Sequence, residues 1–326
     1  MIENLYFYIS ESSDPYENIA IEKHLFDKLS ENDIILYLWQ NKDTVVIGKN
    51  QNPAAECRIS IFEKEGIKLA RRLSGGGAVY HDMGNLNFTF LCSEENYSPE
   101  KQTEIIMKAC TSAGIETEVS GRNDILADGR KFSGNAFYIS KGKVCRHGTL
   151  MIDTDTQILD KLLTPPKAKL EAKGIKSVRS RVINLCELSP CLTTEKMKEY
   201  ILDSFGKCYG KTPTPVKEID KSQIGILSRE FSSWKYLYGK TLPFTLSLDS
   251  HFTWGNAQLN MNVHRGVIES AVFYTDSLDE TLSEKIIHSL TGCLFNPDCV
   301  KKSLVPALST EILDDILSMF SEVFPV

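Results

Sequence analysis

From residue 71 to residue 82 the chain reads RRLSGGGAVYHD. The apolar residues within 67–73 predict a strand, and the glycines at 75–77 end it. Without a Cβ, a glycine backbone can adopt positive φ and approach another group closely. Successive N–H groups of such a loop can enclose an anion, and Arg72 adds a permanent charge with a planar set of donors. The stretch therefore predicts a strand that leads into an anion-binding loop.

The glycine run alone leaves a second interpretation open. Three glycines beside two arginines are more typical of a hairpin turn than of a binding loop. The chain also lacks GxxxxGK[ST] and GxGxxG. The loop is therefore neither a Walker loop nor a dinucleotide fingerprint.

Composition limits the class of protein. A length of 326 residues predicts two domains. A net charge of −6 weighs against nucleic acid as the main partner, and the basic run at 167–176 is more typical of a solvated face. Nine cysteines include no CxxC pair and no zinc spacing. Without a signal-peptide pattern or an apolar run near ~20 residues, we expect a reduced cytoplasmic protein with no membrane partner.

Strands and helices alternate irregularly before residue 246, so the predicted class is α+β rather than a doubly wound sheet. We expect strands at 4–9, 34–39, 44–47, 67–73 and 86–91, and a strand-rich meander at 121–152 with turns near 128 and 141. Helices should follow Asp14-Pro15, Ser98-Pro99 and Thr193. The acid at Glu17 predicts a capping box with Asp14.

A domain boundary is predicted near residue 246, giving domains 1–246 and 247–326. The second domain should hold strands at 252–263 and 266–275, then a helix opened by the capping pattern Ser277-x-x-Glu280. A last helix should carry the apolar residues of 312–320. A small α+β domain of strand–strand–helix–helix order follows from this pattern.

Two polar residues of the meander could handle anions. Asp124 lies in a polar turn after Gly121-Arg122-Asn123, and a carboxylate of this kind suits magnesium together with phosphate oxygens. Lys131 stands just before Ser133-Gly134, where an ammonium could bridge two anionic groups. A turn aspartate and a solvated strand lysine are the simpler alternatives.

Cys145 and His147 raise the question of a thiol nucleophile. They alternate on one strand face, which is a poor geometry for a base and its nucleophile, so a buried and inert cysteine is the better interpretation. Trp39 ends an apolar strand and could equally belong to the core.

Several stretches together resemble the lipoate–protein ligase A family in order and spacing. They are RRLSGGGAVYHD at 71–82, GRND at 121–124, KFSG at 131–134, HGTL at 147–150, LWQN at 38–41, GKNQNP at 48–53, SVRSRV at 177–182, HFTWG at 251–255 and FYTDSL at 273–278. The last two look like accessory-domain motifs. The resemblance covers nearly the whole chain.

This resemblance implies a large mixed-sheet catalytic domain like that of biotin ligases and class II aminoacyl-tRNA synthetases, followed by the small domain. It also implies an ATP-dependent, adenylate-forming ligase with Lys131 as the catalytic residue. Arg72, Gly77, Ala78, Val79, Tyr80 and Lys131 would contact ATP. Lipoate would contact Trp39, Gly75, Gly76, Lys131 and His147. Asp124 would lie near Mg2+.

The acceptors implied by the resemblance are apo-lipoyl domains of 2-oxoacid dehydrogenase acyltransferases and the glycine cleavage H protein. Three alternatives fit the sequence less well. An ATP-independent octanoyl or lipoyl transferase would carry its cysteine near 121–124, where this chain has none. A biotin ligase would show a different glycine–arginine loop. A non-catalytic lipoyl-adenylate-binding homologue would not need Arg72, Asp124 and Lys131 together.

Overall fold

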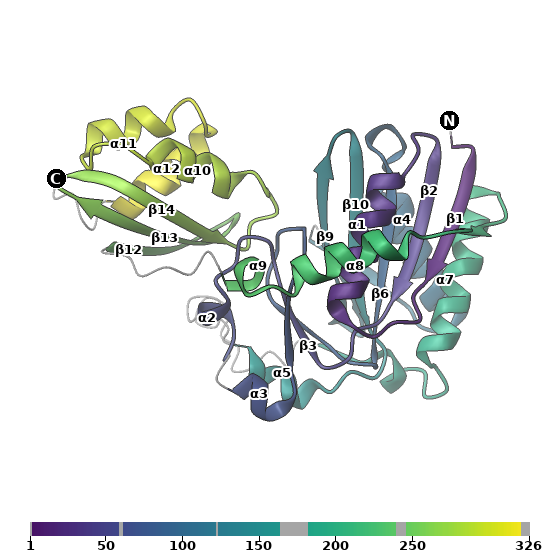
Figure 1. The fold of residues 1–326 in the computed structure, drawn as a ribbon. Coiled ribbons are helices and arrows are strands. Elements are labelled where there is room, and N and C mark those ends of the chain that lie inside the picture. The colour runs from purple at the N-terminus through teal and green to yellow at the C-terminus, as the bar shows by residue number, and fades with distance from the viewer. Residues whose placement is uncertain (1, 59–60, 122, 164–181, 239–245, 321–326) are drawn as a thin grey trace.

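The computed structural model describes residues 2–58, 61–121, 123–163, 182–238 and 246–320. Figure 1 shows a large lobe that contains the N-terminus and a smaller lobe built from residues 246–320. Within these ranges, no helix has the length and apolar character needed to cross a membrane. The basic run at 167–176, Arg122 and most of the SVRSRV motif lie outside the described residues.

The elements of the two lobes have the following bounds. The strands of the large lobe are β1 (Asn4–Ile9), β2 (Asp33–Trp39), β3 (Thr44–Ile47), β4 (Lys68–Arg71), β5 (Val79–His81), β6 (Asn85–Ser93), β7 (Glu118–Ser120), β8 (Asp124–Ala127), β9 (Arg130–Ser140), β10 (Lys143–Met151) and β11 (Thr214–Pro215). Its helices are α1 (Pro15–Lys28), α2 (Pro53–Glu56), α3 (Phe62–Glu65), α4 (Pro99–Ser112), α5 (Thr156–Leu162), α7 (Thr194–Tyr209), α8 (Lys221–Phe231) and α9 (Trp234–Tyr238). The small lobe has β12 (Leu246–Phe252), β13 (Gly255–His264), β14 (Val267–Thr275), α10 (Leu282–Leu290), α11 (Pro297–Leu304) and α12 (Thr310–Met319).

The large lobe is built on a mixed sheet in the order β11-β1-β2-β6-β10-β9-β8-β7. Strands β11, β1 and β2 run parallel, and the pairs from β2 to β7 are antiparallel. A second small sheet has the order β4-β3-β5, and the glycine run connects its two outer strands. Hydrogen bonding between β3 and its neighbours therefore fixes both ends of the glycine loop.

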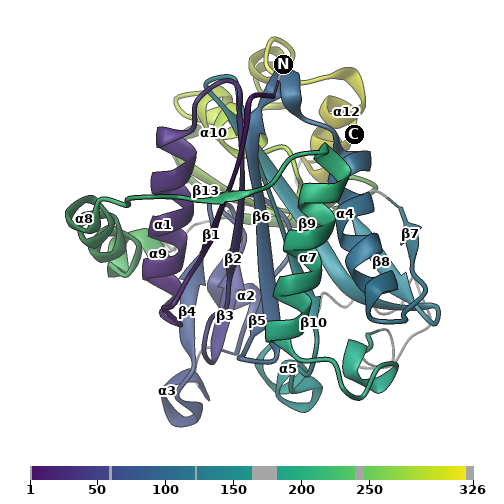
Figure 2. The same ribbon diagram turned by 90° about the vertical axis from the view of Figure 1, so that its right-hand side faces the viewer.

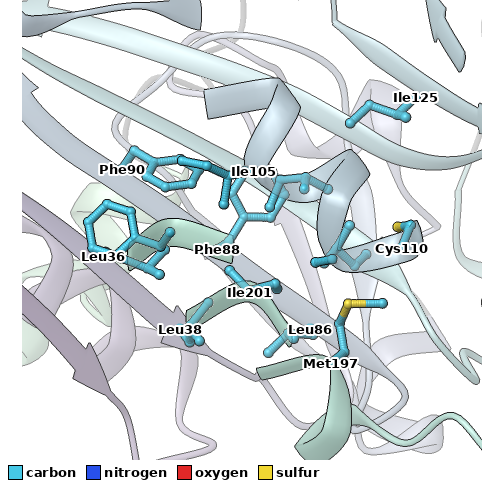
Figure 3. Packing of buried hydrophobic residues seen from close by; sticks show 14 of the residues in the cluster. Leu36, Leu38, Leu86, Phe88, Phe90, Ile105, Cys110, Ile125, Met197 and Ile201 are labelled. Carbon is cyan, nitrogen blue, oxygen red and sulfur yellow. The ribbon is translucent and has the colours of Figure 1, made fainter. Parts of the chain in front are cut away.

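Strand β2 shows how the large sheet is covered on both faces. Because side chains alternate along a strand, Leu36 and Leu38 pack into the core under α4 and α7, whereas Tyr37 and Trp39 pack under α1 and α8. Figure 2 shows these two helix layers on opposite sides of the sheet. Figure 3 shows the α4 and α7 side, where Phe88 lies among Leu36, Ile105 and Ile201.

Helix α1 starts as the sequence predicts, but with a simpler cap. The Asp14 carboxylate accepts from the N–H groups of Tyr16 and Glu17. The Glu17 carboxylate instead accepts from Ser12 Oγ, and Ser12 Oγ also receives the Asp14 N–H. The predicted capping box is therefore wrong, because Ser12 takes both groups that would close it.

The small lobe packs three helices on one face of an antiparallel sheet, β12-β13-β14 (Figure 1). The predicted strand–strand–helix–helix order omits β12 and α11 and is wrong in this respect. The helix predicted to open at Ser277 begins at Leu282 instead. Residues 239–245 lie outside the described part of the chain, so the boundary at 246/247 stays a prediction.

The predicted α+β class, with a large mixed sheet and a small α+β second lobe, is confirmed. The two predicted meander turns are confirmed as well. Asp128-Gly129 and Lys141-Gly142 all have positive φ, the conformation that two-residue hairpins of type I′ require.

Candidate active site

The glycine loop is folded around the Arg72 side chain. The Arg72 guanidinium donates to the carbonyls of Gly75 and Gly77 at 2.7 and 2.8 Å, and Nε donates to Ser74 Oγ at 3.1 Å. Gly76 has a φ of +90°, and a Cβ there would lie 2.8 Å from Arg72 Nη2. Burial lowers the pKa of Arg72 to about 10. Arg72 thus holds the shape of the loop from its buried side.

Arg71 connects the glycine loop to a second loop, the GKNQNP segment at residues 48–53. Its Nη1 donates to the carbonyls of Gly48, Lys49 and Gln51, and its Nη2 donates to Leu237 of α9. A Cβ on Gly48 would lie 2.2 Å from the Gly76 carbonyl oxygen. Only glycine at 48 permits this approach, so the GKNQNP segment lies directly against the glycine loop.

Tyr80 follows the glycine loop on β5, and its ring is buried. Only 5% of the residue is exposed, and it packs in a core cluster with Val45, Ile47 and Leu162. A nucleotide contact at Tyr80 would therefore use its backbone. Gly77, by contrast, is exposed, and a Cβ there would meet nothing within 4 Å.

Lys131 and Asp124 form an ion pair at a bulge in the β8–β9 hairpin. Lys131 Nζ lies 2.7 Å from Asp124 Oδ1, and the two side chains are 40% and 42% exposed. The register shifts between Ile125 and Leu126. Strand β9 also reaches the glycine loop, because a Cβ on Gly76 would lie 3.8 Å from Ala136 Cβ.

A buried hydrogen-bond chain connects Trp39 and His147 to the start of the glycine loop. Trp39 Nε1 donates to Thr89 Oγ1, which donates to Glu22 Oε1 at 2.8 Å. The same Glu22 oxygen lies 2.9 Å from His147 Nδ1. His147 Nε2 lies 2.6 Å from Ser74 Oγ. The structure thus brings Trp39, His147 and the glycine loop together at one wall of the lobe.

Cys145 lies beside this chain but is poorly suited to act as a nucleophile. It is fully buried, and burial raises the pKa of its thiol well above the ordinary value. Ligand atoms of Glu22, Cys145 and His147 lie within 4.8 Å of one another. The imidazole, however, already uses both nitrogens, toward Glu22 and Ser74. The prediction of a buried cysteine is confirmed.

Two family models match the chain. The lipoyl protein ligase A/B catalytic domain matches residues 14–206, more than half of the chain, and the bacterial lipoate protein ligase C-terminus matches residues 241–318. The chain belongs to the lipoyl protein ligase A/B family. The resemblance inferred from the sequence motifs is confirmed.

Solved structures agree with this membership. LipL1 of P. falciparum in complex with lipoate is 28% identical, with a TM-score of 0.86 over 98% of this chain and 100% of that chain. A lipoate-protein ligase A bound with ATP is 22% identical, with a TM-score of 0.62 over 73% of this chain and 99% of that one. A bi-partite lipoate protein ligase from Thermoplasma acidophilum, described with its E2 lipoyl domain, is 23% identical, with a TM-score of 0.63 over 76% and 100%.

In this family member, the second lobe contacts the glycine loop at Gly75. A Cβ on Gly75 would lie 2.3 Å from the carbonyl oxygen of Ser277. Nearby, the Thr275 N–H donates to the Asn50 carbonyl, and Asn50 Nδ2 donates to the Glu280 carbonyl. Lys49 Nζ lies 3.8 Å from Glu280 Oε2. The FYTDSL motif of the small lobe thus contacts the GGG and GKNQNP motifs of the large lobe.

A cavity of about 1280 Å³ opens beside this contact, between the large lobe and residues 278–281. Its lining includes Asn135, Tyr138, Arg146 and Leu278. None of the residues predicted to bind ATP or lipoate lines it.

Glu22 was missed by the sequence analysis, although a signal was present. Asn18 and Glu22 are one turn apart on a helix whose Ile19, Ile21 and Leu25 are buried. A carboxylate on a buried helix face needs a partner. Its partner His147 is 125 residues away, and only the sheet brings the two together.

Proposed function

We propose that this lipoyl protein ligase family member activates lipoate with ATP and transfers the lipoyl group to a lysine of an acceptor protein. The observation that carries this proposal is the similarity of both lobes, over 98% of the chain, to a structure that contains lipoate. The ATP-bound lipoate-protein ligase A supports the nucleotide half of the proposal. We place the activity in the cytoplasm.

The first step joins two anions. A lipoate carboxylate oxygen attacks the α-phosphorus of ATP, the new O–P bond forms, and pyrophosphate leaves. Lys131 is assigned to lie between the carboxylate and the α-phosphate, because a fixed ammonium offsets their repulsion and the charge that develops on the phosphate oxygens. Backbone groups of 77–80 are assigned to the nucleotide, and Arg72 holds them in place through the loop carbonyls.

The donor chemistry at Asp124 fits magnesium. A single carboxylate combined with phosphate oxygens is a typical Mg2+ environment, and the Asp124 side chain is 42% exposed. Mg2+ would neutralise charge on the phosphate oxygens of ATP when bound. Binding of ATP would also have to separate Lys131 from Asp124. The Lys131 ammonium would then contact the α-phosphate, and the Asp124 carboxylate would contact Mg2+.

The second step uses the lipoyl adenylate. The acceptor amine attacks the activated carbonyl carbon, the C–N bond forms, and the bond to the AMP oxygen breaks. Trp39, Gly75, Gly76 and His147 are assigned to the lipoyl group because they meet at one wall of the lobe. We propose lipoyl domains and the glycine cleavage H protein as acceptors, and the relative described with its E2 lipoyl domain supports the first of these.

The test incubates the protein with lipoate, ATP, Mg2+ and an apo-lipoyl domain and measures the mass of the acceptor. We expect a lipoyl adduct with ATP and none without it. An adduct that forms from an acyl donor protein without ATP would favour a transferase instead. Binding of lipoyl adenylate without any adduct would favour a non-catalytic role.

A further inference from the structure

The carboxylate of Asp276 is held at the end of the small lobe that contacts the glycine loop. Strand β14 pairs with β13 as far as Thr275, which lies opposite Ala257, and Asp276 is the first residue beyond this pairing. The Asn256 N–H donates to Asp276 Oδ1 at 2.6 Å, and Asn256 Nδ2 donates to Asp276 Oδ2 at 3.1 Å. Both carboxylate oxygens are therefore bound by one residue at the start of β13.

The turn that precedes β13 is shaped around this carboxylate. Gly255 has a φ of +146°, and a Cβ there would lie 2.6 Å from Asp276 Oδ1 and 3.1 Å from the Ser277 nitrogen. Glycine is the residue that permits both this conformation and this approach. His251 Nδ1 lies 2.7 Å from Asn256 Oδ1, so the side chain that donates to Asp276 is itself held from β12. The turn therefore fixes the position of Asp276.

The two neighbours of Asp276 in the chain contact the large lobe. On one side, the Thr275 N–H donates to the Asn50 carbonyl at 3.0 Å. On the other side, the Ser277 carbonyl lies against Gly75, and the Ser277 N–H donates to Thr275 Oγ1 at 3.0 Å. Asp276 is thus held by its own lobe, and the segment that it holds contacts the other lobe.

Asp276 also acts on the glycine loop through its charge. Arg72 is 8% exposed and donates to the carbonyls of Gly75 and Gly77. Burial lowers the pKa of Arg72 to about 10, and the Glu22 and Asp276 carboxylates act in the opposite direction. A buried cation is costly unless an anion compensates it. Because Glu22 belongs to the large lobe and Asp276 to the small lobe, Asp276 stabilises the Arg72 charge only while the lobes are in contact.

We propose that Asp276 is a positioning residue that couples the contact between the lobes to the shape of the ATP-binding glycine loop. This inference rests on the proposed ligase function. Asp276 places the Ser277 carbonyl against Gly75, and its negative charge stabilises Arg72, which holds the loop carbonyls. The loop is therefore held in its ATP-binding shape when the lobes are in contact and is held less firmly when they separate.

Two substitutions remove this coupling by different routes. Asp276→Asn removes the charge and one of the two oxygens that accept from Asn256. Gly255→Ala keeps the carboxylate but displaces it, because the new methyl group would overlap Asp276 Oδ1. As matched controls, Asp249→Asn makes the same charge change at an exposed position of β12. Gly266→Ala adds a methyl group at the other hairpin of the lobe, where φ is +76° and a Cβ would meet nothing within 4 Å.

The experiment measures ATP binding by calorimetric titration and lipoyl adenylate formation from lipoate and ATP, with each full-length variant. Asp276→Asn and Gly255→Ala should bind ATP about 10-fold more weakly than the wild type, a factor typical of coupled sites. In adenylate formation, KM for ATP should rise by a similar factor while kcat stays unchanged, because saturating ATP restores the shape of the loop. Asp249→Asn and Gly266→Ala should match the wild type. A residue that only stabilises the small lobe would lower the melting temperature without separating KM from kcat.

Unchanged ATP affinity in a folded Asp276→Asn variant, or an equal loss of affinity in Asp249→Asn, would overturn the coupling. A fall in kcat with an unchanged KM for ATP would overturn it as well. If one of the two test variants does not fold by circular dichroism, the other decides, and if neither folds, Asp276 is a structural residue and the coupling is refuted. A wild-type protein that neither binds ATP nor forms lipoyl adenylate would instead refute the ligase function.

Discussion

Lys131 Nζ lies 2.7 Å from Asp124 Oδ1 across the β8–β9 bulge, so the ammonium and the carboxylate neutralise each other in this structure. Both side chains are about two-fifths exposed. An ion pair that is accessible to solvent contributes little to stability. The pair can therefore separate at small cost when phosphate oxygens offer Lys131 a second partner.

Replacing Lys131 with Met tests its assignment to both half-reactions. Met keeps an apolar stem of similar length and removes the charge. Loss of such an electrostatic contact typically lowers a rate by ~100- to 1000-fold, and adenylate formation and transfer should both fall. Lys108→Met is the matched control, because Lys108 Nζ also lies 2.7 Å from a carboxylate, that of Glu104, on the solvent-exposed face of α4. Near-normal rates in Lys131→Met would refute the assignment.

Gly77→Val tests whether the glycine loop binds the nucleotide. The glycine run predicts positive φ in this loop, and the structure has it at Gly76 and not at Gly77. A side chain at Gly77 meets nothing within 4 Å, so the fold should keep its melting temperature. ATP binding should weaken strongly, because the new branches occupy the space assigned to the nucleotide. Calorimetric titration with ATP checks this, and unchanged ATP affinity in a folded variant would contradict it.

Cys145→Ser tests the thioester alternative. Burial raises the pKa of the Cys145 thiol well above its ordinary value, which disfavours the nucleophilic thiolate. We expect the variant to keep its ligase activity, and we expect no acyl adduct on the wild-type enzyme. Intact-protein mass spectrometry during turnover checks both. An acyl-enzyme that disappears in Cys145→Ser would establish the transferase instead.

The sequence predicted best those strands and helices whose hydrophobic pattern and capping residues indicate the same element. Apolar runs, Asp14-Pro15 and Ser98-Pro99 mark strands and helix starts, and the structure keeps them. The pattern Ser277-x-x-Glu280 misled because one of its groups is used in a local turn and the other in a contact with the large lobe. Ser277 Oγ accepts the Asp279 N–H, and the Glu280 carbonyl receives Asn50 Nδ2 from the large lobe.

The site residues fall into the same two groups, those with a local sequence signal and those that depend on tertiary contacts. Glycines, Lys131 and Asp124 could be singled out because each follows a turn or loop of recognisable sequence. Strand β12 was missed because Ser247, Asp249 and Ser250 make it polar. Its extended conformation is stabilised by antiparallel pairing with β13. Glu22 was missed because its hydrogen bonds to Thr89 and His147 exist only once the folded sheet places these residues beside it.

Truncation after residue 246 tests what the second lobe contributes. The described residues assigned to ATP and lipoate all lie before it, yet the Ser277 carbonyl covers Gly75. A second lobe that contacts the loop at Gly75 could close the site for adenylate formation, as lids do in many enzymes. Truncation should therefore impair adenylate formation more than transfer from supplied lipoyl adenylate. The fragment must first show a cooperative melting transition. A larger loss in transfer would assign the second lobe to acceptor recognition.

The contact between the two lobes should depend on pH through Glu280. The Glu280 side chain is 13% exposed at this contact. Its Oε1 has no hydrogen-bond partner among the described residues. Burial raises the pKa of Glu280 from its ordinary value of 4.5 to about 8, Lys49 acts in the opposite direction, and Asp279 and Glu284 add to the rise.

The sign follows from linkage. Glu280 binds its proton more tightly when the lobes are in contact, so forming the contact takes up a proton. The contact should weaken as the pH rises from 4.5 to about 8 and then level off. Small-angle X-ray scattering should show a radius of gyration that grows over this range. Glu280→Gln should abolish the growth, whereas Glu284→Gln, which changes a 73% exposed partner of the same Lys49, should retain it. The same growth in Glu280→Gln would assign the pH response to another group.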